Sequence, residues 1–282
     1  MKDFLIVIPT HARPARQITY NNLSTQLRAQ TVIVTSTRED AHYFRMNYDD
    51  PYDIVIAPPS QVRCIAEKRH WIMNNILAHN IFMLDDDLTF YHRCPPTLRH
   101  WDTTKGMWRL NDPTSRVRLS CKATDHDLNK CFAFVHEAFE LYGAVGISQR
   151  RNNDKVQDDW RNTERLMFAF GINRDLYRKL RIRFDAVRCR EDFHVTLALL
   201  ERGVNNTVYY SLHQNPGSFG AAGGASTERS LTQSNRQAFV LAKLHPGFVQ
   251  CVQRAYKTSL PRTEVIVQWK KAYASSQKRR TR

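Results

Sequence analysis

Short apolar stretches alternate with longer amphipathic segments over the first ninety residues of the chain. The apolar stretches are rich in β-branched side chains, as buried strands are, and occupy residues 4–8, 31–35, 53–57 and 81–84. The segments between them are long enough for crossover helices, and the last one, over 62–77, carries apolar side chains on one face at helical spacing. This alternation predicts an α/β fold in which helices flank a mostly parallel sheet of the nucleotide-binding kind.

The pattern is less regular in the rest of the chain. An amphipathic helix is expected over 128–139 and a second helix from Cys189 to Gly203, and further strands over 144–148, 166–173 and 209–213. Prolines and a glycine interrupt residues 88–120, which also contain Trp101 and Trp108. That composition indicates an irregular lid or acceptor-binding loop. We expect one domain over residues 1–250, followed by a C-terminal helix and a frayed basic tail over 251–282.

The charge of the chain is strongly positive. Forty-two Lys and Arg residues stand against 27 Asp and Glu, which gives a net charge of +15 over 282 residues. Such an excess favours a polyanionic partner, and we expect nucleic acid rather than a membrane. No apolar run is long enough to span a bilayer and Met1 to Leu5 lack a signal-peptide pattern, so we expect a soluble, intracellular protein.

Several common site types are disfavoured by the sequence. The six cysteines lie far apart with no CxxC pair, which argues against a zinc knuckle and favours reduced, mostly buried thiols. The loop after the first strand, over 10–14, has neither a GxGxxG nor a GxxxxGK pattern. A dehydrogenase-type dinucleotide site and an ATPase-type phosphate loop are therefore not expected.

Three carboxylates follow the strand that ends at Leu84. If the backbone stays extended there, Asp85 and Asp87 face one way and Asp86 the other, a spacing that suits one divalent cation. A turn or helix N-cap is the simpler alternative, because Asp favours both. Three adjacent unpaired carboxylates repel one another, which shifts the balance towards a metal or a sugar nucleotide.

Polar side chains elsewhere could serve a ligand or only face solvent. Arg63, Lys68 and Arg69 lie off the apolar face of the predicted helix over 62–77. Glu191 and Asp192 open a later helix, where an acid either caps the helix or acts in catalysis. The basic loop over 149–153 offers groups that phosphates and base edges accept.

The order of these features resembles that of GT-A nucleotide-sugar transferases: an Asp-x-Asp after a strand, a glycine turn, a Glu-Asp pair opening a helix and a late histidine. More narrowly, the chain resembles the phage and kinetoplastid glycosyltransferases that attach sugars to 5-hydroxymethylpyrimidines in DNA. That group is related to the base J glucosyltransferase and is associated with TET/JBP-type oxygenases. The likeness extends over about residues 4 to 229, and five stretches carry it: 6–10, 65–69, 84–87, 190–193 and 223–226.

The resemblance implies a GT-A catalytic domain and a role for each matching residue. Asp192 would be the base, supported by Glu191, and Asp87, His213 and Asp85 would hold a divalent metal, Mn²⁺ or Mg²⁺. The remaining donor-site residues would be Pro9, Thr10, His11, Arg13, Arg63, Lys68, Arg69, Asp85, Asp86, Gly171, Gly223, Gly224 and Arg229. From charge and aromatic content, DNA would be bound by Trp101, Trp108, Arg150, Arg151, Asn152, Asn153, Lys278, Arg279 and Arg280.

The implied activity is metal-dependent transfer of a sugar, with glucose as the first choice, from a UDP-sugar to DNA. The acceptor would be the hydroxymethyl group of 5-hydroxymethylcytosine or 5-hydroxymethyluracil, and one base with in-line attack would invert the anomeric carbon. The setting would be the cytoplasm of a phage-infected bacterium, with no membrane and no obligate protein partner. Two alternatives stay open: a two-metal nuclease or recombinase acting on DNA, and a basic DNA-binding protein without catalysis.

Overall fold

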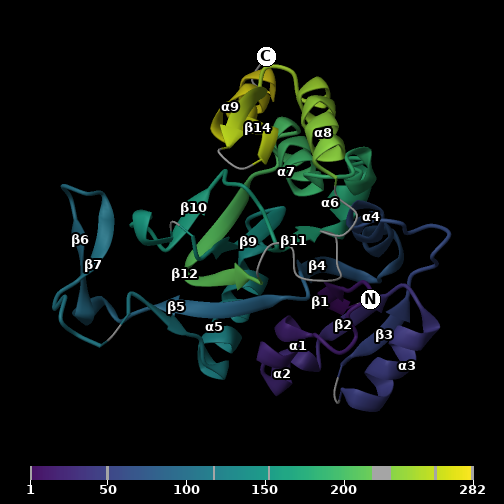
Figure 1. Cartoon of the computed structure of the whole chain (residues 1–282), viewed down its shortest axis with the longest axis horizontal. Helices are drawn as coiled ribbons and strands as arrows, with labels where there is room; N and C mark the ends of the chain where they lie inside the picture. Colours follow the sequence, from purple (N-terminus) through teal and green to yellow (C-terminus); the bar gives the residue numbers. More distant parts are fainter. Residues whose placement is uncertain are drawn as a thin grey trace.

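The computed structural model describes residues 2–48, 51–116, 118–151, 153–217, 230–256 and 259–280. Its main feature is a large mixed sheet in the order β3-β2-β1-β4-β11-β9-β12-β5-β8, with β10 paired to β12 (Figure 1). The first four strands are parallel, as the alternating pattern predicts: β1 (Lys2–Pro9), β2 (Thr31–Thr35), β3 (Asp53–Ile56) and β4 (Ala78–Leu84). The helices that accompany them are α1 (Ile18–Asn22), α2 (Thr25–Arg28), α3 (Arg38–Asn47) and α4 (Ile65–Asn75).

The second half of the sheet mixes strand directions. Strands β11, β5 and β10 run antiparallel to all the others. The remaining strands of the sheet point the same way, so the sheet is mostly parallel. Its strands are β5 (Leu88–Arg93), β8 (Ser120–Lys122), β9 (Ala144–Gln149), β10 (Trp160–Asn162), β11 (Ala169–Asn173) and β12 (Asn206–Pro216). The helices of this half are α5 (Asp125–Ala138), α6 (Arg174–Lys179) and α7 (Glu191–Glu201).

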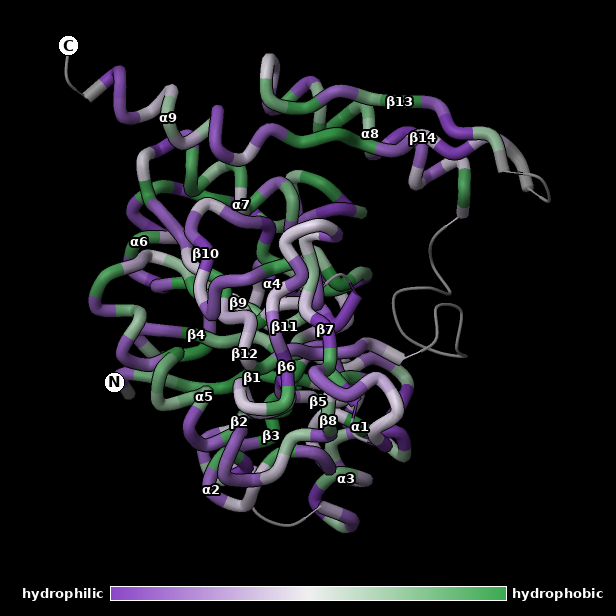
Figure 2. The backbone as a smooth tube through the Cα atoms, turned by 90° about the vertical axis from the view of Figure 1, so that its left-hand side faces the viewer, coloured by the Kyte–Doolittle hydropathy of each residue, from purple (hydrophilic) through white to green (hydrophobic). Residues whose placement is uncertain are grey.

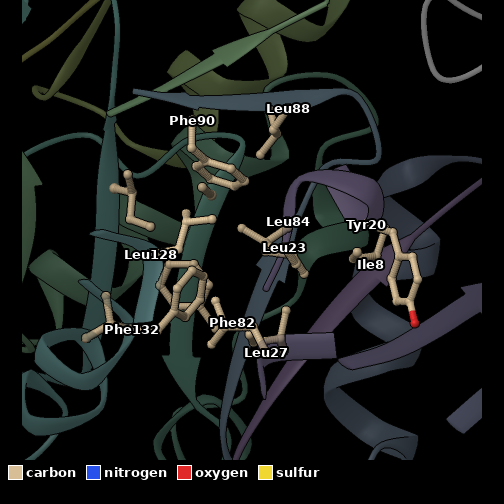
Figure 3. Close-up of a cluster of buried hydrophobic side chains, with 14 of the residues drawn as sticks. Ile8, Tyr20, Leu23, Leu27, Phe82, Leu84, Leu88, Phe90, Leu128 and Phe132 are labelled. Carbon is tan, nitrogen blue, oxygen red and sulfur yellow. The ribbon is translucent and has the colours of Figure 1, made fainter. Parts of the chain in front are cut away.

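Each face of the sheet is covered by its own apolar cluster. On one face, Phe82 and Phe90 pack with Leu128 and Phe132 of α5 (Figure 3). On the other, Met83 of β4 belongs to a cluster with residues of α4, α6 and α7. Burial on both faces explains why the strands appear in the sequence as continuous apolar runs.

Gly171 lies within β11 and not in a turn. A Cβ atom built there would come within 2.7 Å of the rings of Phe82 and Phe139. The residue is small because β11 and α5 approach closely, and the expectation that it belongs to a donor-site turn is wrong.

The segment over 88–120 is more ordered than its composition predicts. It contains β5, a short helical turn (Pro96–Leu98), a two-stranded hairpin of β6 (Arg99–Asp102) and β7 (Met107–Leu110), and β8. The hairpin projects from the end of β5, away from the N-terminal strands (Figure 1). The expectation of an irregular loop is therefore wrong, because these strands are too short and too interrupted to show a strand pattern.

The C-terminal region is a packed unit of α8 (Leu231–Leu244), β13 (Val249–Tyr256), β14 (Ser259–Val267) and α9 (Trp269–Arg280). The boundary expected at residue 250 falls inside β13. Although α9 is predominantly hydrophilic (Figure 2), Ala272 is buried beside Leu197 and Leu200 of α7. The helix expected here is present, and its described part is packed rather than frayed. No helix among the described residues is both long and apolar enough to cross a membrane.

Candidate active site at the carboxyl ends of β1 and β4

The adjacent parallel strands β1 and β4 bring Thr10 and the acidic residues together. The Thr10 hydroxyl donates to an Asp86 carboxylate oxygen (2.9 Å), and Gln17 donates to the same hydroxyl (2.9 Å). The buried ammonium of Lys68 donates to the Thr10 carbonyl. Lys68 therefore fixes the loop after β1. Burial raises the pKa of Asp86 to about 6, against the lowering effect of Arg13.

The three carboxylates do not alternate as an extended strand would require. The backbone turns at Asp86 and Asp87, so the expectation that Asp85 and Asp87 face the same way is not met. Asp85 accepts a hydrogen bond from Arg69, whereas Asp86 and Asp87 share Arg13, whose Nη1 lies 3.6 and 3.4 Å from their oxygens.

Residue Thr19 of α1 fixes that turn from outside it. Its hydroxyl donates to the carbonyl of Asp85 and accepts from the N–H of Leu88 (2.7 Å), while its own N–H donates to the carbonyl of Asp86 (3.1 Å). No local pattern in the sequence indicates this contact, which joins positions 66 residues apart or more.

Arg69 connects the acidic turn to the start of α7. One guanidinium nitrogen donates to Asp85 (2.5 Å) and another to Glu191 (2.8 Å), and all three side chains lie wholly or mostly out of solvent. Burial alone would lower the pKa of Arg69, but the carboxylates of Asp85, Glu191 and Asp192 outweigh it and raise that pKa. The Asp-x-Asp segment and the Glu-Asp pair, more than 100 residues apart in sequence, thus meet at one arginine.

Asp192, the expected base, lies beside Glu191 and accepts a hydrogen bond from Arg165 (2.8 Å). The Arg165 guanidinium stacks over Phe193 with its carbon 3.7 Å from the ring centre. Because this arginine precedes β11 without any local signal, sequence reasoning missed it. Its contacts hold the Asp192 carboxylate in one orientation.

The start of α7 is positioned by the C-terminal unit. Arg190 caps the helix in the left-handed conformation (φ 69°) and donates to the carbonyls of Ser234 and Thr263. A non-glycine residue in this conformation costs about 1 kcal/mol or more and persists where its surroundings hold it. Residues of α8 and β14 therefore support the turn that carries Glu191 and Asp192.

His213 does not lie beside Asp87. It pairs with Tyr91 in the middle of β5, and the residue next to Asp87 is Gly217, which directly follows β12 and whose N–H donates to the Asp87 carbonyl (3.0 Å). Four strand residues separate the two positions by roughly 13 Å. The Nε2 atom of His213 is hydrogen-bonded to the Ser120 hydroxyl. The expected Asp87–His213 metal pair is therefore wrong.

The carboxylates still suit a hard divalent cation. No group of three His, Cys, Asp or Glu side chains among the described residues is arranged to hold a metal. Mg²⁺ and Mn²⁺ are commonly held by one or two carboxylates together with substrate phosphates, so Asp85 and Asp87 need not face the same way for one of them to serve as a ligand. Space beside Asp87 is kept open by Gly217, because a Cβ atom there would lie 3.3 Å from an Asp87 oxygen.

The other expected donor-site residues are divided between this site and its surroundings. Pro9 is the buried last residue of β1, and His11 is exposed in the loop that follows. Arg63 is exposed and pairs with Glu67 on the surface of α4. Gly223, Gly224 and Arg229 lie outside the described residues.

The expected DNA-binding residues fall into two separate regions. Trp101 and Trp108 face each other across the β6–β7 hairpin with ring centres 5.4 Å apart, and Arg150 lies over Tyr91 at 4.2 Å. Asn153 is buried and bonded to Arg93, Ser148 and Tyr210, so its expected DNA contact is wrong. Of the rest, Lys278 and Arg279 are exposed on α9 at the C-terminal unit, Arg151 is exposed, and Asn152 and the side chain of Arg280 lie outside the described residues.

Comparison with solved structures shows the fold. Staphylococcus aureus TarS 1–349 in complex with UDP-GlcNAc superposes with a TM-score of 0.50 at 12% identity, over 86% of this chain and 67% of that one. Mycobacterium tuberculosis glucosyl-3-phosphoglycerate synthase in complex with Mn²⁺, UDP and glucosyl-3-phosphoglycerate gives 0.48 at 9% identity, over 93% and 87%. In other TarS structures this chain spans 66% and 39% of the length. The match to TarS at a TM-score of 0.50 shows a shared GT-A fold.

The family is shown by sequence. No curated protein matches the chain. A family model described as TET-associated glycosyltransferase matches residues 4–224, which is more than half of the chain and includes β1 through β12. Glycosyl transfer is thereby favoured over the nuclease and the non-catalytic alternatives. The C-terminal unit from α8 to α9 lies outside the match. The chain belongs to the TET-associated glycosyltransferase family.

Proposed function

We propose that the protein transfers a sugar, glucose as the first choice, from a UDP-sugar to the hydroxymethyl group of a 5-hydroxymethylpyrimidine in DNA. The observation that carries this proposal is the Arg69 bridge, because it places Asp85 and the Glu191–Asp192 pair at one site. A glycosyltransferase needs both a donor-binding group and a base within reach of the acceptor hydroxyl. The family's association with TET-type oxygenases supports a hydroxymethylated base as the acceptor.

A UDP-sugar donor is supported by the fold neighbours, which include TarS in complex with UDP-GlcNAc. Asp85 and Asp87 would hold a divalent metal whose charge, when bound, neutralises the leaving diphosphate. Thr10, Gln17 and Lys68 fix the loop beside them, so the donor pocket is ordered before the donor arrives. Such preorganisation reduces the reorganisation needed in the transition state.

Asp192 would act as the base. Its carboxylate takes the proton of the hydroxymethyl oxygen while that oxygen forms a bond to the anomeric carbon of the sugar. The bond from that carbon to the diphosphate breaks in the same step, and its electron pair leaves with UDP. Arg165 keeps the carboxylate oriented, and Glu191 anchors the first turn of α7 to Arg69. One base with in-line attack inverts the anomeric configuration.

A polymeric acceptor is supported by the net charge of +15. A hydroxymethyl group inside a duplex cannot reach a recessed site at the ends of β1 and β4. We therefore expect the target nucleotide to be flipped out of the stack, at a cost of a few kcal/mol repaid by basic and aromatic contacts.

Mass spectrometry of nucleosides tests the function directly. DNA containing 5-hydroxymethylcytosine, 5-hydroxymethyluracil or neither is incubated with the protein, a divalent metal and UDP-glucose, UDP-galactose or UDP-GlcNAc. We expect a hexose adduct on one hydroxymethylated nucleoside and none on unmodified DNA, with loss of the adduct in Asp192→Asn and in excess chelator. If no combination yields an adduct while the protein is folded, the proposed acceptor is wrong.

A further inference from the structure

One face of β5 leads away from the active site. Leu88 and Phe90 point into the cluster formed with α5 (Figure 3). Strand side chains alternate, so Thr89, Tyr91 and Arg93 lie on the opposite face of β5, which begins directly after the turn at Asp86 and Asp87. We call this row, from Asp87 to Arg93, the β5 track.

A cavity of about 210 Å³ lies at the far end of the β5 track. Its lining residues include Arg93, Arg99, Arg150, His213 and Asp154. We call this cavity the arginine pocket. Trp108 forms part of its wall from the β6–β7 hairpin. The pocket is thus built by β5, β12, the hairpin and the loop after β9.

The charges of the arginine pocket are not balanced within the protein. Arg93 is paired with Asp159 (3.4 Å), so three arginines against Asp154 and Asp159 leave one positive charge. Burial, with help from Arg93 and Arg150, lowers the pKa of His213 to about 3 and keeps it neutral. Arg99 has two buried nitrogens, Nε and Nη1, without hydrogen-bond partners, and neither Arg99 nor Arg150 has an ion pair with a described residue. Like charges held together in this way call for an anionic ligand.

Arg93 differs from the other two arginines. It donates to Asn153, Asp158, Asp159 and Val156, so its hydrogen bonds are satisfied inside the protein. Burial, followed by the charge of Arg99, lowers the pKa of Arg93 to about 10. Arg93 forms the floor of the pocket, whereas Arg99 and Arg150 remain available to a ligand.

The size and place of the pocket indicate what the anion is. A cavity of about 210 Å³ holds a phosphate group but not a nucleotide sugar. It lies four to six β5 residues from Asp87, which is roughly 13 to 20 Å, or about four to six nucleotides of a stacked strand. The edge-to-face pair of Trp101 and Trp108 beside it offers apolar surface for bases or sugars.

We propose that the arginine pocket binds one backbone phosphate of the acceptor DNA strand, about four to six nucleotides from the nucleotide that receives the sugar. The β5 track then lies under the intervening strand and sets its direction across the active site. This inference rests on the proposed function, since it takes the acceptor to be DNA. It adds an anchoring site separate from the carboxylates that act on the donor.

Replacing single phosphates by neutral groups shows which phosphate of the strand the arginine pocket contacts. A fluorescent single strand carries one 5-hydroxymethylpyrimidine, each phosphate in turn is replaced by a methylphosphonate, and affinity is measured by anisotropy without UDP-sugar. We expect one substitution, about four to six nucleotides from the modified base, to weaken binding by about tenfold or more. In Arg99→Gln and Arg150→Gln the unmodified strand should bind about tenfold more weakly, and that position should no longer matter.

Two further variants test whether the charge of the arginine pocket determines how tightly the strand binds. Asp154→Asn removes the carboxylate of the pocket and should bind the strand more tightly, which a structural role does not predict. Arg178→Gln removes an exposed positive charge on α6 and should behave as the unaltered protein. Only variants whose thermal unfolding midpoint equals that of the unaltered protein are compared.

The possible outcomes separate the pocket from the function. A uniform response to every methylphosphonate, or the same positional effect in Arg99→Gln, overturns the proposal. Competition by inorganic phosphate without any positional effect shows that the pocket takes a small anion, and also overturns it. If the positional coupling is found but no sugar is transferred to hydroxymethylated DNA, the pocket assignment stands and the proposed function fails.

Discussion

The two ends of the β5 track differ in whether their charged side chains are paired with opposite charges. At the active site, each carboxylate discussed above has a cationic partner: Arg69 for Asp85 and Glu191, Arg13 for Asp86 and Asp87, and Arg165 for Asp192. In the arginine pocket, Arg99 and Arg150 have no carboxylate partner among the described residues. The carboxylates of the candidate active site are therefore paired within the protein, while the arginine pocket keeps two arginines without a carboxylate partner among the described residues.

The roles proposed for the two regions account for this difference. Catalytic carboxylates need fixed positions, and a buried ion pair supplies them at the cost of desolvating both partners. A phosphate contact needs free cationic groups, because partners already paired would have to be separated first. The comparison thus predicts that arginines of the two regions respond differently to the same substitution.

The largest effect is expected for Arg69→Met. Removing this buried guanidinium leaves Asp85 and Glu191 facing each other out of solvent, and we expect a loss of about 3–5 kcal/mol in the free energy of unfolding. Arg99→Met leaves no carboxylate unpaired, so we expect it to lower the free energy of unfolding by less than about 1 kcal/mol. Urea denaturation of both variants, with the exposed Arg178→Met as control, measures the contrast. Equal losses of unfolding free energy in Arg69→Met and Arg99→Met would contradict the predicted difference between the two regions.

Asp192→Asn should have the next largest effect. The amide keeps the shape of the carboxylate but cannot accept the acceptor proton, so we expect kcat to fall by about 10²-fold or more. Binding of the UDP-sugar should stay nearly unchanged, and the exposed Asp3→Asn serves as the matched control. Calorimetry with the nucleotide sugar and initial rates separate the two quantities. Normal turnover of Asp192→Asn together with a dead Glu191→Gln would exchange the two roles.

A smaller effect concerns pH and His213. In the folded protein burial lowers the pKa of His213 to about 3, whereas an unfolded histidine titrates near 6.5. The unfolded state therefore binds more protons over this interval, and stability falls as pH decreases below about 6.5. At pH 5 the loss should be about 2 kcal/mol relative to pH 7. His213→Gln should remove this pH-dependent part, and parallel stability curves for the two proteins would show that His213 is not held neutral.

Much of the fold was accessible from the sequence because its cause is local. Residues 4–8 and 32–34 are uninterrupted apolar runs that are buried on both faces of the sheet, and β1 and β2 are found there. The meeting of Asp85 with Glu191 has no such local cause, because Glu191 opens α7 and does not follow a strand, and only the family resemblance implied that the two share a site. The hairpin carrying Trp101 and Trp108 had no comparable signal, since each of its strands is only four residues long.

The misplacement of His213 has a specific structural reason. The sequence predicts a strand that ends at this histidine, but β12 continues to Pro216 and its pairing with β9 shifts register between Tyr209 and His213. Three additional strand residues move the imidazole out of the active site and place Gly217 there. Register shifts and contacts such as Arg165 with Asp192 depend on the tertiary structure, and a pattern along the chain does not contain them.

The most direct test of the account compares three acceptors across a salt series. Rates of sugar transfer are measured on hydroxymethylated duplex, hydroxymethylated single strand and free hydroxymethylated nucleoside. If the basic pocket anchors a DNA backbone that the active site then modifies, both polymers react much faster than the nucleoside, and their advantage falls steeply as salt rises. Equal rates on all three acceptors, unaffected by salt, would contradict the account.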